Sequence, residues 1–150
     1  MPIATYYLHN PAAPKPNLPT HYGANVWLVW QDRLLLERRS DCDLWGLIGG
    51  GRKAGETDLQ AALRETREET GLELPASAFV PVRVYDDPDR IASYRDGSVW
   101  NMVIALFRVE LPQPPALHCS RESSRLRFFT RQELKSLPVV QTHRDLVDDF

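Results

Sequence analysis

Runs of branched and aromatic residues, separated by short polar breaks, predict most of a β-sheet. Residues 21–30 and 33–39 are both strongly apolar, and only Gln31 and Asp32 lie between them. A two-residue break between two such runs is typical of a β-hairpin. Further strands are predicted at residues 45–48, 79–85, 99–110 and 125–129.

The pattern changes from strand-like to helical after residue 55. Small or apolar residues then recur at the three- and four-residue spacing of one helical face, at Leu59, Ala62, Leu63, Thr66 and Thr70. Thr57 is a good N-cap, and Gly71 suits the left-handed position that follows a helix. We therefore predict a helix that starts near Glu56 or Thr57 and ends at Gly71.

Two shorter helices are predicted near the C-terminus. Thr130 precedes residues 131–137, which Pro138 closes, and Thr142 precedes residues 143–150. Strands on both sides of a central helix, followed by further helices, are typical of a mixed sheet covered on both faces. The predicted fold class is therefore α/β, an α/β/α sandwich with a mixed β-sheet.

Proline content divides the chain into two parts. Residues 1–20 hold five of the twelve prolines, and proline both fixes φ and removes a backbone donor. This segment is predicted to be an extended arm that covers a sheet edge or crosses to a second copy of the chain, so a homodimer is one expectation. Residues 21–150 form the single predicted domain, in which residues 86–98 are expected to be a polar loop.

Composition narrows the class of protein. The chain of 150 residues has a net charge of −2, and it contains no apolar run of the roughly 20 residues that span a membrane. A soluble, cytoplasmic protein is expected, and the slightly negative charge disfavours nucleic acid as a partner. The two cysteines and four histidines are scattered, so neither a disulfide nor a zinc site is expected.

The predicted central helix carries the candidate chemistry. Glu65, Glu68 and Glu69 stand at i, i+3 and i+4, so they share one face. Their mutual repulsion favours a bound cation, and Mg²⁺ or Mn²⁺ prefers carboxylate oxygens. A solvated acidic helix face is the alternative at this point. The glycines at 49–51 let the backbone approach a ligand closely, and Arg64 is placed to pair with Glu68.

The spacing of the whole stretch resembles the signature box of the Nudix hydrolase family. The matching positions follow at fixed intervals, at Gly50, Glu56, Arg64, Glu65, Glu68, Glu69 and Gly71. Thr66 is the departure, because the family usually has an aliphatic residue there. The resemblance implies an α/β/α sandwich that cleaves a pyrophosphate linkage in a nucleoside diphosphate derivative, by attack of water on phosphorus with the help of divalent cations.

Position by position, the resemblance also implies roles for the box residues. Glu65 and Glu69 correspond to direct metal ligands, together with the carbonyl of Gly50. Glu68 corresponds to a metal ligand or to the base that activates water. Arg64 corresponds to the partner that orients Glu68.

Residues around the box are further candidates. Glu56 corresponds to the glutamate that holds the loop to the helix. Arg52 and Lys53 place positive charge beside the expected phosphate, although relatives frequently have an acid at the position of Lys53. Arg39 ends a strand from which it can reach phosphate, and a solvated cation is the alternative for all three. Relatives often carry another carboxylate before a pair of aromatic residues, and Glu122 is the nearest acid here, as a candidate ligand or base.

The substrate is the least defined part of the prediction. Pro88 lies 16 residues after Leu72, as in some relatives that act on ADP-ribose, and so favours ADP-ribose or a nucleotide sugar. Tyr85, Tyr94 and Trp100 are candidates for stacking on a base, with core packing as the alternative. The alternative functions are a catalytically silent domain that senses a nucleotide, and a hydrolase of nucleoside triphosphates or RNA 5′ ends.

Overall fold

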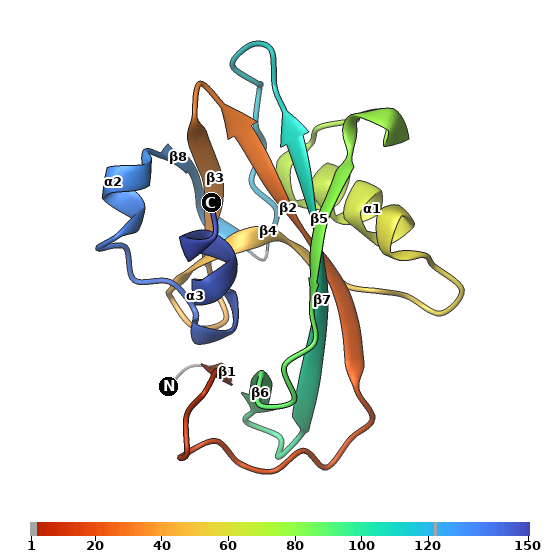
Figure 1. Cartoon of the computed structure of the whole chain (residues 1–150), viewed down its shortest axis with the longest axis vertical. Coiled ribbons are helices and arrows are strands. Elements are labelled where there is room, and N and C mark those ends of the chain that lie inside the picture. The colour runs from red at the N-terminus through yellow and green to blue at the C-terminus, as the bar shows by residue number, and fades with distance from the viewer. Residues whose placement is uncertain (1–2, 122) are drawn as a thin grey trace.

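The computed structural model describes residues 3–121 and 123–150 (Figure 1). Its strands are β1 (Ala4–Tyr7), β2 (His21–Trp30), β3 (Arg33–Arg39), β4 (Trp45–Gly51), β5 (Val80–Tyr85), β6 (Ile91–Tyr94), β7 (Val99–Glu110) and β8 (Ser123–Phe129). Its α-helices are α1 (Asp58–Thr70), α2 (Arg131–Leu134) and α3 (Gln141–Asp148), and a short 3₁₀ turn covers Ala76–Ala78.

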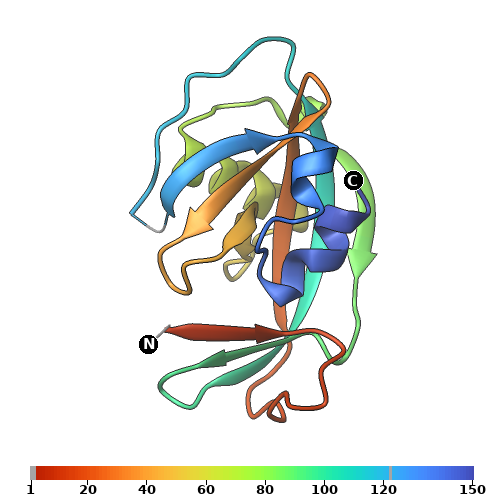
Figure 2. The ribbon, with the colours of Figure 1, turned by 90° about the vertical axis from the view of Figure 1, so that its left-hand side faces the viewer.

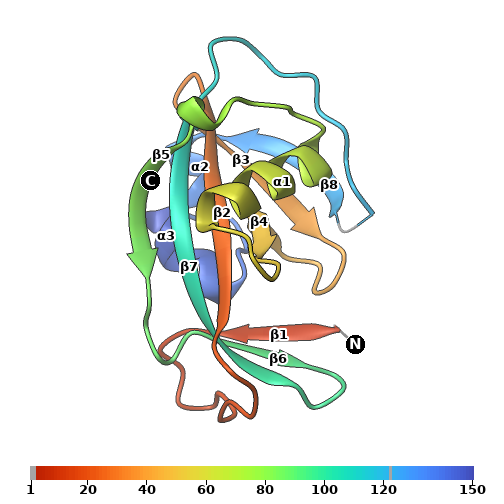
Figure 3. The ribbon, with the colours of Figure 1, turned by 90° about the vertical axis from the view of Figure 1, so that its right-hand side faces the viewer.

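The sheet is mixed and is covered on both faces. Its strand order is β1-β6-β7-β2-β4-β3-β8, and β5 also pairs with β7. β2 runs parallel to β7, whereas it is antiparallel to β4. α1 lies on one face, and α2 and α3 lie on the other (Figures 2 and 3). The predicted α/β/α sandwich with a mixed sheet is confirmed.

Consecutive residues of β2 point alternately into two separate cores. Val26 and Leu28 belong to the core that includes Ala62 of α1. Trp27 and Val29 belong to the core that includes residues of α3. A strand that is buried on both faces is apolar at every position, which explains the unbroken apolar run in this part of the sequence.

One short strand lies in the segment that was predicted to be a polar loop. β6 pairs with the start of β7 and with β1, and its residues Ile91 and Ala92 are buried. The loop prediction for residues 86–98 was therefore wrong at its centre. The strand could not be recognised from the sequence because β6 has only four residues and because its partner β1 comes from the N-terminal arm. β1 covers the outer edge of β6 in the same chain (Figure 2). The homodimer stays a prediction.

The last helix begins earlier than predicted. Its N-cap is Val140, and the prediction that Thr142 caps it was wrong because Thr142 is buried inside the helix. The sheet sets this start, since the Val140 N–H donates to the Trp45 carbonyl at 2.9 Å, beside a bridge between Trp45 and Val139.

Thr130 caps α2 as predicted, although α2 is shorter than expected. None of the helices in the described part of the chain has the length and apolar character to cross a membrane.

Candidate active site

α1 places two carboxylates inside the protein and one at its surface. The Thr57 side chain caps the helix, and Gly71 ends it with a φ of 79°, both as predicted. Glu65 and Glu69 are 9% and 2% exposed, whereas the Glu68 side chain is 47% exposed. The acidic face that the sequence predicts therefore has a buried edge and a solvent-facing edge.

The glycines of β4 lie directly against the buried carboxylates. β4 continues to Gly51, three residues farther than predicted, because it pairs with the first half of β2. The Gly49 N–H donates to Glu69 Oε2 at 3.1 Å. A Cβ at Gly50 would lie 2.6 Å from Glu65 Oε1, so a side chain at this position would displace the carboxylate.

Arg64 joins the loop after β4 to the helix. Its guanidinium donates to both Glu56 oxygens, at 2.7 and 2.9 Å, and to the Gly51 carbonyl at 2.9 Å. It also donates to Glu65 at 2.9 Å and to Glu68 at 3.1 Å. The hydrogen bonds from Arg64, followed by one from the backbone, lower the pKa of Glu56 to about 2. The predicted pairing of Arg64 with Glu68 is present, and Glu56 links the loop to the helix.

A fourth carboxylate, which the sequence did not single out, lies in the same region. Glu37 of β3 is 2% exposed and accepts a hydrogen bond from Ser123 Oγ at 2.5 Å. Burial, then the charges of Glu37 and Glu65, raise the pKa of Glu69 well above its ordinary value. The available signal in the sequence is a glutamate that directly follows three leucines in a predicted strand.

The buried carboxylates fit a divalent cation in charge and in donor type. Burial and the charges of Glu37 and Glu65 disfavour the charged form of Glu69 and raise its pKa, so a bound cation would stabilise this group of carboxylates. Carboxylate and carbonyl oxygens are the donors that Mg²⁺ and Mn²⁺ prefer. Glu68 lies at the exposed edge of this face and pairs with Arg64 at 3.1 Å. The ligand set of Gly50, Glu65, Glu68 and Glu69 stays a prediction.

A second group of possible ligands lies near β1 and β6. The ligand atoms of His9, Asp87 and Asp89 lie within 4.8 Å of one another. His9 Nδ1 is 2.7 Å from Asp89, and both side chains are largely solvent-exposed. Exposed ion pairs of this kind are common on protein surfaces, and we assign no ligand to this group.

Arg39 is held by an internal network that ties β1 to the end of β3. Its Nε and Nη2 donate to the two Asp41 oxygens at 2.9 and 2.7 Å. Nη2 also donates to Tyr6 Oη at 3.1 Å, and the Tyr6 hydroxyl donates to Asp41 at 2.7 Å. Arg39 lines a cavity beside the glycines of β4, and its contact with substrate phosphate stays a prediction.

Stability should fall in acid as Asp41 takes up a proton. Burial alone would raise the pKa of Asp41, but hydrogen bonds and charge from Arg39 outweigh it and lower this pKa from 3.8 to about 2. A carboxyl whose pKa is depressed in the folded state stabilises the fold above its unfolded-state pKa, and this contribution is lost as pH falls through the folded-state pKa. The free energy of unfolding, measured in urea between roughly pH 2 and 5, should therefore fall less steeply for Asp41→Asn than for the wild type. Equal slopes of the unfolding free energy against pH in the two proteins would contradict this stabilising role of Asp41.

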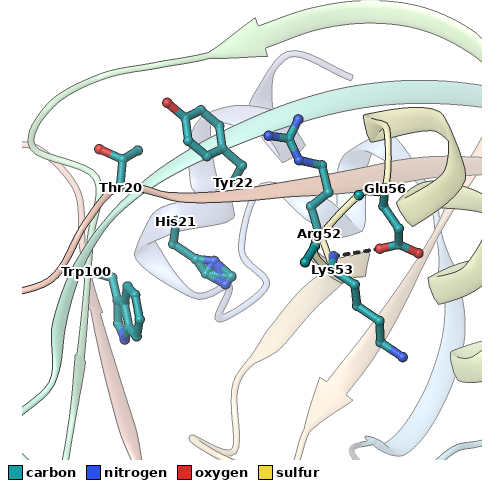
Figure 4. Close-up of a pocket in the computed structure, with 9 residues that line it drawn as sticks. Thr20, His21, Tyr22, Arg52, Lys53, Glu56 and Trp100 are labelled. Atoms are coloured by element: carbon teal, nitrogen blue, oxygen red, sulfur yellow. Dashed lines mark hydrogen bonds between the residues drawn. The ribbon is translucent and has the colours of Figure 1, made fainter.

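Two cavities lie near the end of β4, and the inner one borders its glycines. The inner cavity, of about 100 Å³, lies between these glycines, β2 and the β1–β6 pair, and Tyr94 and His143 line it. The outer cavity, of about 430 Å³, is lined by the loop after β4, the start of β2 and Trp100 (Figure 4). His21 lines both cavities.

His143 contributes an uncharged ring to the inner cavity. Its Nδ1 accepts a hydrogen bond from the Leu47 N–H at 3.1 Å, so the neutral ring carries its proton on Nε2. Burial lowers the pKa of His143 to about 3. The ring is therefore neutral at physiological pH, and it supplies polarity to the cavity without a charge.

Arg52 and Lys53 lie in the loop after β4 and line the outer cavity. Arg52 pairs with Asp58 at 3.0 Å, and its guanidinium carbon lies 4.9 Å from the centre of the Tyr22 ring. Both cations are thus beside a cavity, and their contact with substrate stays a prediction. Glu122, the candidate loop acid, lies outside the described residues.

The candidate aromatic residues divide between core and cavity. Tyr85 is 2% exposed and packs in the core beneath α3, so the alternative of core packing holds for it. Tyr94 lines the inner cavity and Trp100 the outer one. Pro88 lies in the loop after β5, where its carbonyl accepts a hydrogen bond from Asn101 at 3.1 Å. It lines neither of these two cavities, so its value as a substrate marker gains no support from the structure.

The comparison with protein families decides the assignment, because a family model described as the NUDIX domain matches residues 19–150. The chain belongs to the Nudix family. It is 32% identical over 102 residues to the nucleoside triphosphatase NudI of Enterobacter sp. (strain 638), and the match covers 67% of this chain and 71% of that protein. It is 44% identical over 43 residues to the dihydroneopterin triphosphate diphosphatase of Escherichia coli (strain K12), which is 29% of each chain. The chain is therefore a Nudix-type hydrolase that acts on phosphoric anhydride bonds.

Solved structures share the fold of this Nudix hydrolase. A bifunctional NMN adenylyltransferase/ADP ribose pyrophosphatase from Francisella tularensis matches with a TM-score of 0.70 and 25% identity, over 88% of this chain and 40% of that chain. The E. coli dihydroneopterin triphosphate pyrophosphohydrolase matches with a TM-score of 0.68 and 23% identity, over 86% and 93% of the two chains. The Nudix chain therefore spans about two fifths of the Francisella chain and nearly all of the E. coli one.

Proposed function

We propose that this Nudix hydrolase cleaves the diphosphate linkage of a nucleoside diphosphate derivative, with ADP-ribose or a nucleotide sugar as the leading substrates and Mg²⁺ or Mn²⁺ as the cation. The observation that carries the proposal is the buried Glu65–Glu69 pair against Gly49 and Gly50, with Arg64 beside it. Such a pair is costly to bury without a cation. A cation site next to a backbone of glycines leaves room for phosphate oxygens.

Each residue of the site has a distinct role in this proposal. Glu65, Glu69 and the Gly50 carbonyl would hold the cation, which would supply positive charge to stabilise the phosphate oxygens. The Glu68 carboxylate faces solvent and takes the proton from the attacking water. Arg64 positions Glu68 through the hydrogen bond at 3.1 Å. Glu122 is the other candidate for the proton acceptor.

A nucleoside triphosphate is the second candidate substrate, and the 32% identity to the nucleoside triphosphatase NudI favours it. A domain that binds a nucleotide without hydrolysing it is disfavoured, because Arg64, Glu65, Glu68 and Glu69 are all present. RNA ends are disfavoured by the net charge of −2. The products of the reaction separate the two enzymatic candidates.

A panel of substrates tests the proposal. Purified protein is incubated with ADP-ribose, a nucleotide sugar and nucleoside triphosphates in Mg²⁺ or Mn²⁺, and the products are identified by chromatography. We expect AMP and ribose 5-phosphate from ADP-ribose, and no product once EDTA has removed the cation. Hydrolysis of triphosphates alone would favour the second candidate. An absence of hydrolysis of every compound would contradict the proposed function.

A further inference from the structure

The outer cavity is a concave surface that the proposed cation site does not use. It has a volume of about 430 Å³, which is within the usual size range of small-molecule sites. Figure 4 shows Arg52, Lys53 and Glu56 on one side of it, and His21 and Trp100 on the other. The two sides differ in chemistry, because one carries charges and the other carries rings.

The charged side of the outer cavity has an excess of positive charge. Glu56 is the acid in its lining, and Arg64 donates to both of its oxygens. Arg52 pairs with Asp58 at 3.0 Å. The Lys53 N–H is fixed by Glu56 Oε1 at 2.7 Å, and its ammonium forms no ion pair with any residue that the structure describes. Lys53 is therefore the cation most available to an anionic ligand.

The opposite side of the outer cavity presents rings. The His21 and Trp100 rings are centred 5.5 Å apart and meet edge to face at 72°. Tyr22, which is 46% exposed, lies against the Arg52 guanidinium and so belongs to the charged side. Burial lowers the pKa of His21, so this side adds little charge at neutral pH. The His21 and Trp100 rings in the same cavity as the Lys53 cation suit a ligand that has both a ring and a phosphate.

His21 connects the outer cavity to the catalytic helix. Its ring lines both cavities and rests on the backbone of Gly51, where a Cβ would overlap it. The preceding residue, Gly50, lies directly against the Glu65 carboxylate. A ligand in the outer cavity is thus separated from the proposed cation site by one or two residues of β4.

We propose that the outer cavity binds the second half of the substrate, a ring that carries a phosphate, with Lys53 on the phosphate and Trp100 beside the ring. This inference rests on the proposed function, and it specifies the group on the far side of the cleaved linkage. The preferred substrate is then a diphosphate with a ring at each end. A nucleoside triphosphate has no second ring to fill this cavity.

Binding of the separated half tests this inference. Ribose 5-phosphate, AMP and inorganic phosphate are titrated into the Mg²⁺-loaded wild type, Lys53→Ala and Trp100→Ala, and the dissociation constants are measured by calorimetry. Lys53→Ala should raise the dissociation constant of ribose 5-phosphate by about 10-fold or more, as expected for the loss of a charge-assisted hydrogen bond. Trp100→Ala should weaken the binding of the two ring-bearing probes, ribose 5-phosphate and AMP, and leave the binding of inorganic phosphate unchanged. If Lys53→Ala weakens the binding of AMP more than that of ribose 5-phosphate, the ring in the cavity belongs to a nucleoside. If it weakens the binding of ribose 5-phosphate more, the ring belongs to a sugar.

Lys135→Ala is the matched control, because Lys135 is exposed and lies outside both cavities. It should bind every probe as the wild type does, and circular dichroism checks that each variant is folded. Equal affinity of the wild type and Lys53→Ala for both ring-bearing probes, or no binding by either protein, overturns the inference. That outcome leaves the proposed function standing if ADP-ribose is hydrolysed. Binding that depends on Lys53, without hydrolysis of any compound, contradicts the proposed function alone.

Discussion

Replacing Glu68 by glutamine lowers the rate of hydrolysis by at least about 100-fold and leaves the fold intact. The Glu68 side chain is 47% exposed, so the change disturbs no packed group. Glutamine can still accept the hydrogen bond that Arg64 donates at 3.1 Å, but it cannot take a proton from water. The measurement is kcat at saturating cation with the substrate that the panel identifies.

Glu73→Gln is the matched control for this prediction. Glu73 is an exposed glutamate just after α1, and its substitution should change kcat by less than roughly two-fold, as expected for a surface position. The thermal midpoints of both variants should match that of the wild type. Near-normal activity of Glu68→Gln would show that the proton acceptor lies elsewhere, and Glu122 would then be the next residue to replace.

Replacing Asp145 by asparagine destabilises the protein by about 2 kcal/mol, because it removes one of the two carboxylates that pair with the buried Arg90. Arg90 is 0% exposed, and it donates to the two Asp145 oxygens at 2.9 and 2.6 Å. In the variant, the Arg90 charge keeps Asp87, at 2.9 Å, and the Thr142 carbonyl as partners. The measurement is the free energy of unfolding in urea.

Asp148→Asn is the matched control on the same helix. Asp148 pairs with Arg144 at 2.7 Å, but its side chain is 61% exposed. Exposed ion pairs contribute little to stability, so the free energy of unfolding of this variant should fall by less than about 1 kcal/mol. Equal losses of unfolding free energy in the two variants would contradict the prediction, because they would show that the ion pair of the buried Arg90 stabilises the protein no more than an exposed pair does.

The features that were predicted correctly depend on residues close together in the chain. The ends of α1 follow from Thr57 and Gly71, whose side chain and backbone conformation act within one turn. The Arg64–Glu68 contact follows from the i, i+4 geometry of any α-helix. The long apolar strands were also recognisable, because burial on both faces leaves an unbroken apolar run.

The features that were missed depend on segments far apart in the chain. Thr142 is a good cap by composition, yet the contact of Val140 with Trp45 in the sheet moves the start of α3. β6 is a strand because β1 and β7 lie on either side of it. Glu37 looks like an ordinary strand residue until β8 brings Ser123 to its carboxylate.

The box from Gly50 to Leu72 could therefore be recognised from spacing alone, together with its family and the type of bond that it hydrolyses. Backbone hydrogen bonds repeat every four residues in a helix, so the relative positions of these side chains are set locally. The surroundings of the box could not be obtained in this way. The burial of Glu37 and the meeting of His21 with Gly51 arise from strand pairing, which forms contacts that local sequence does not encode.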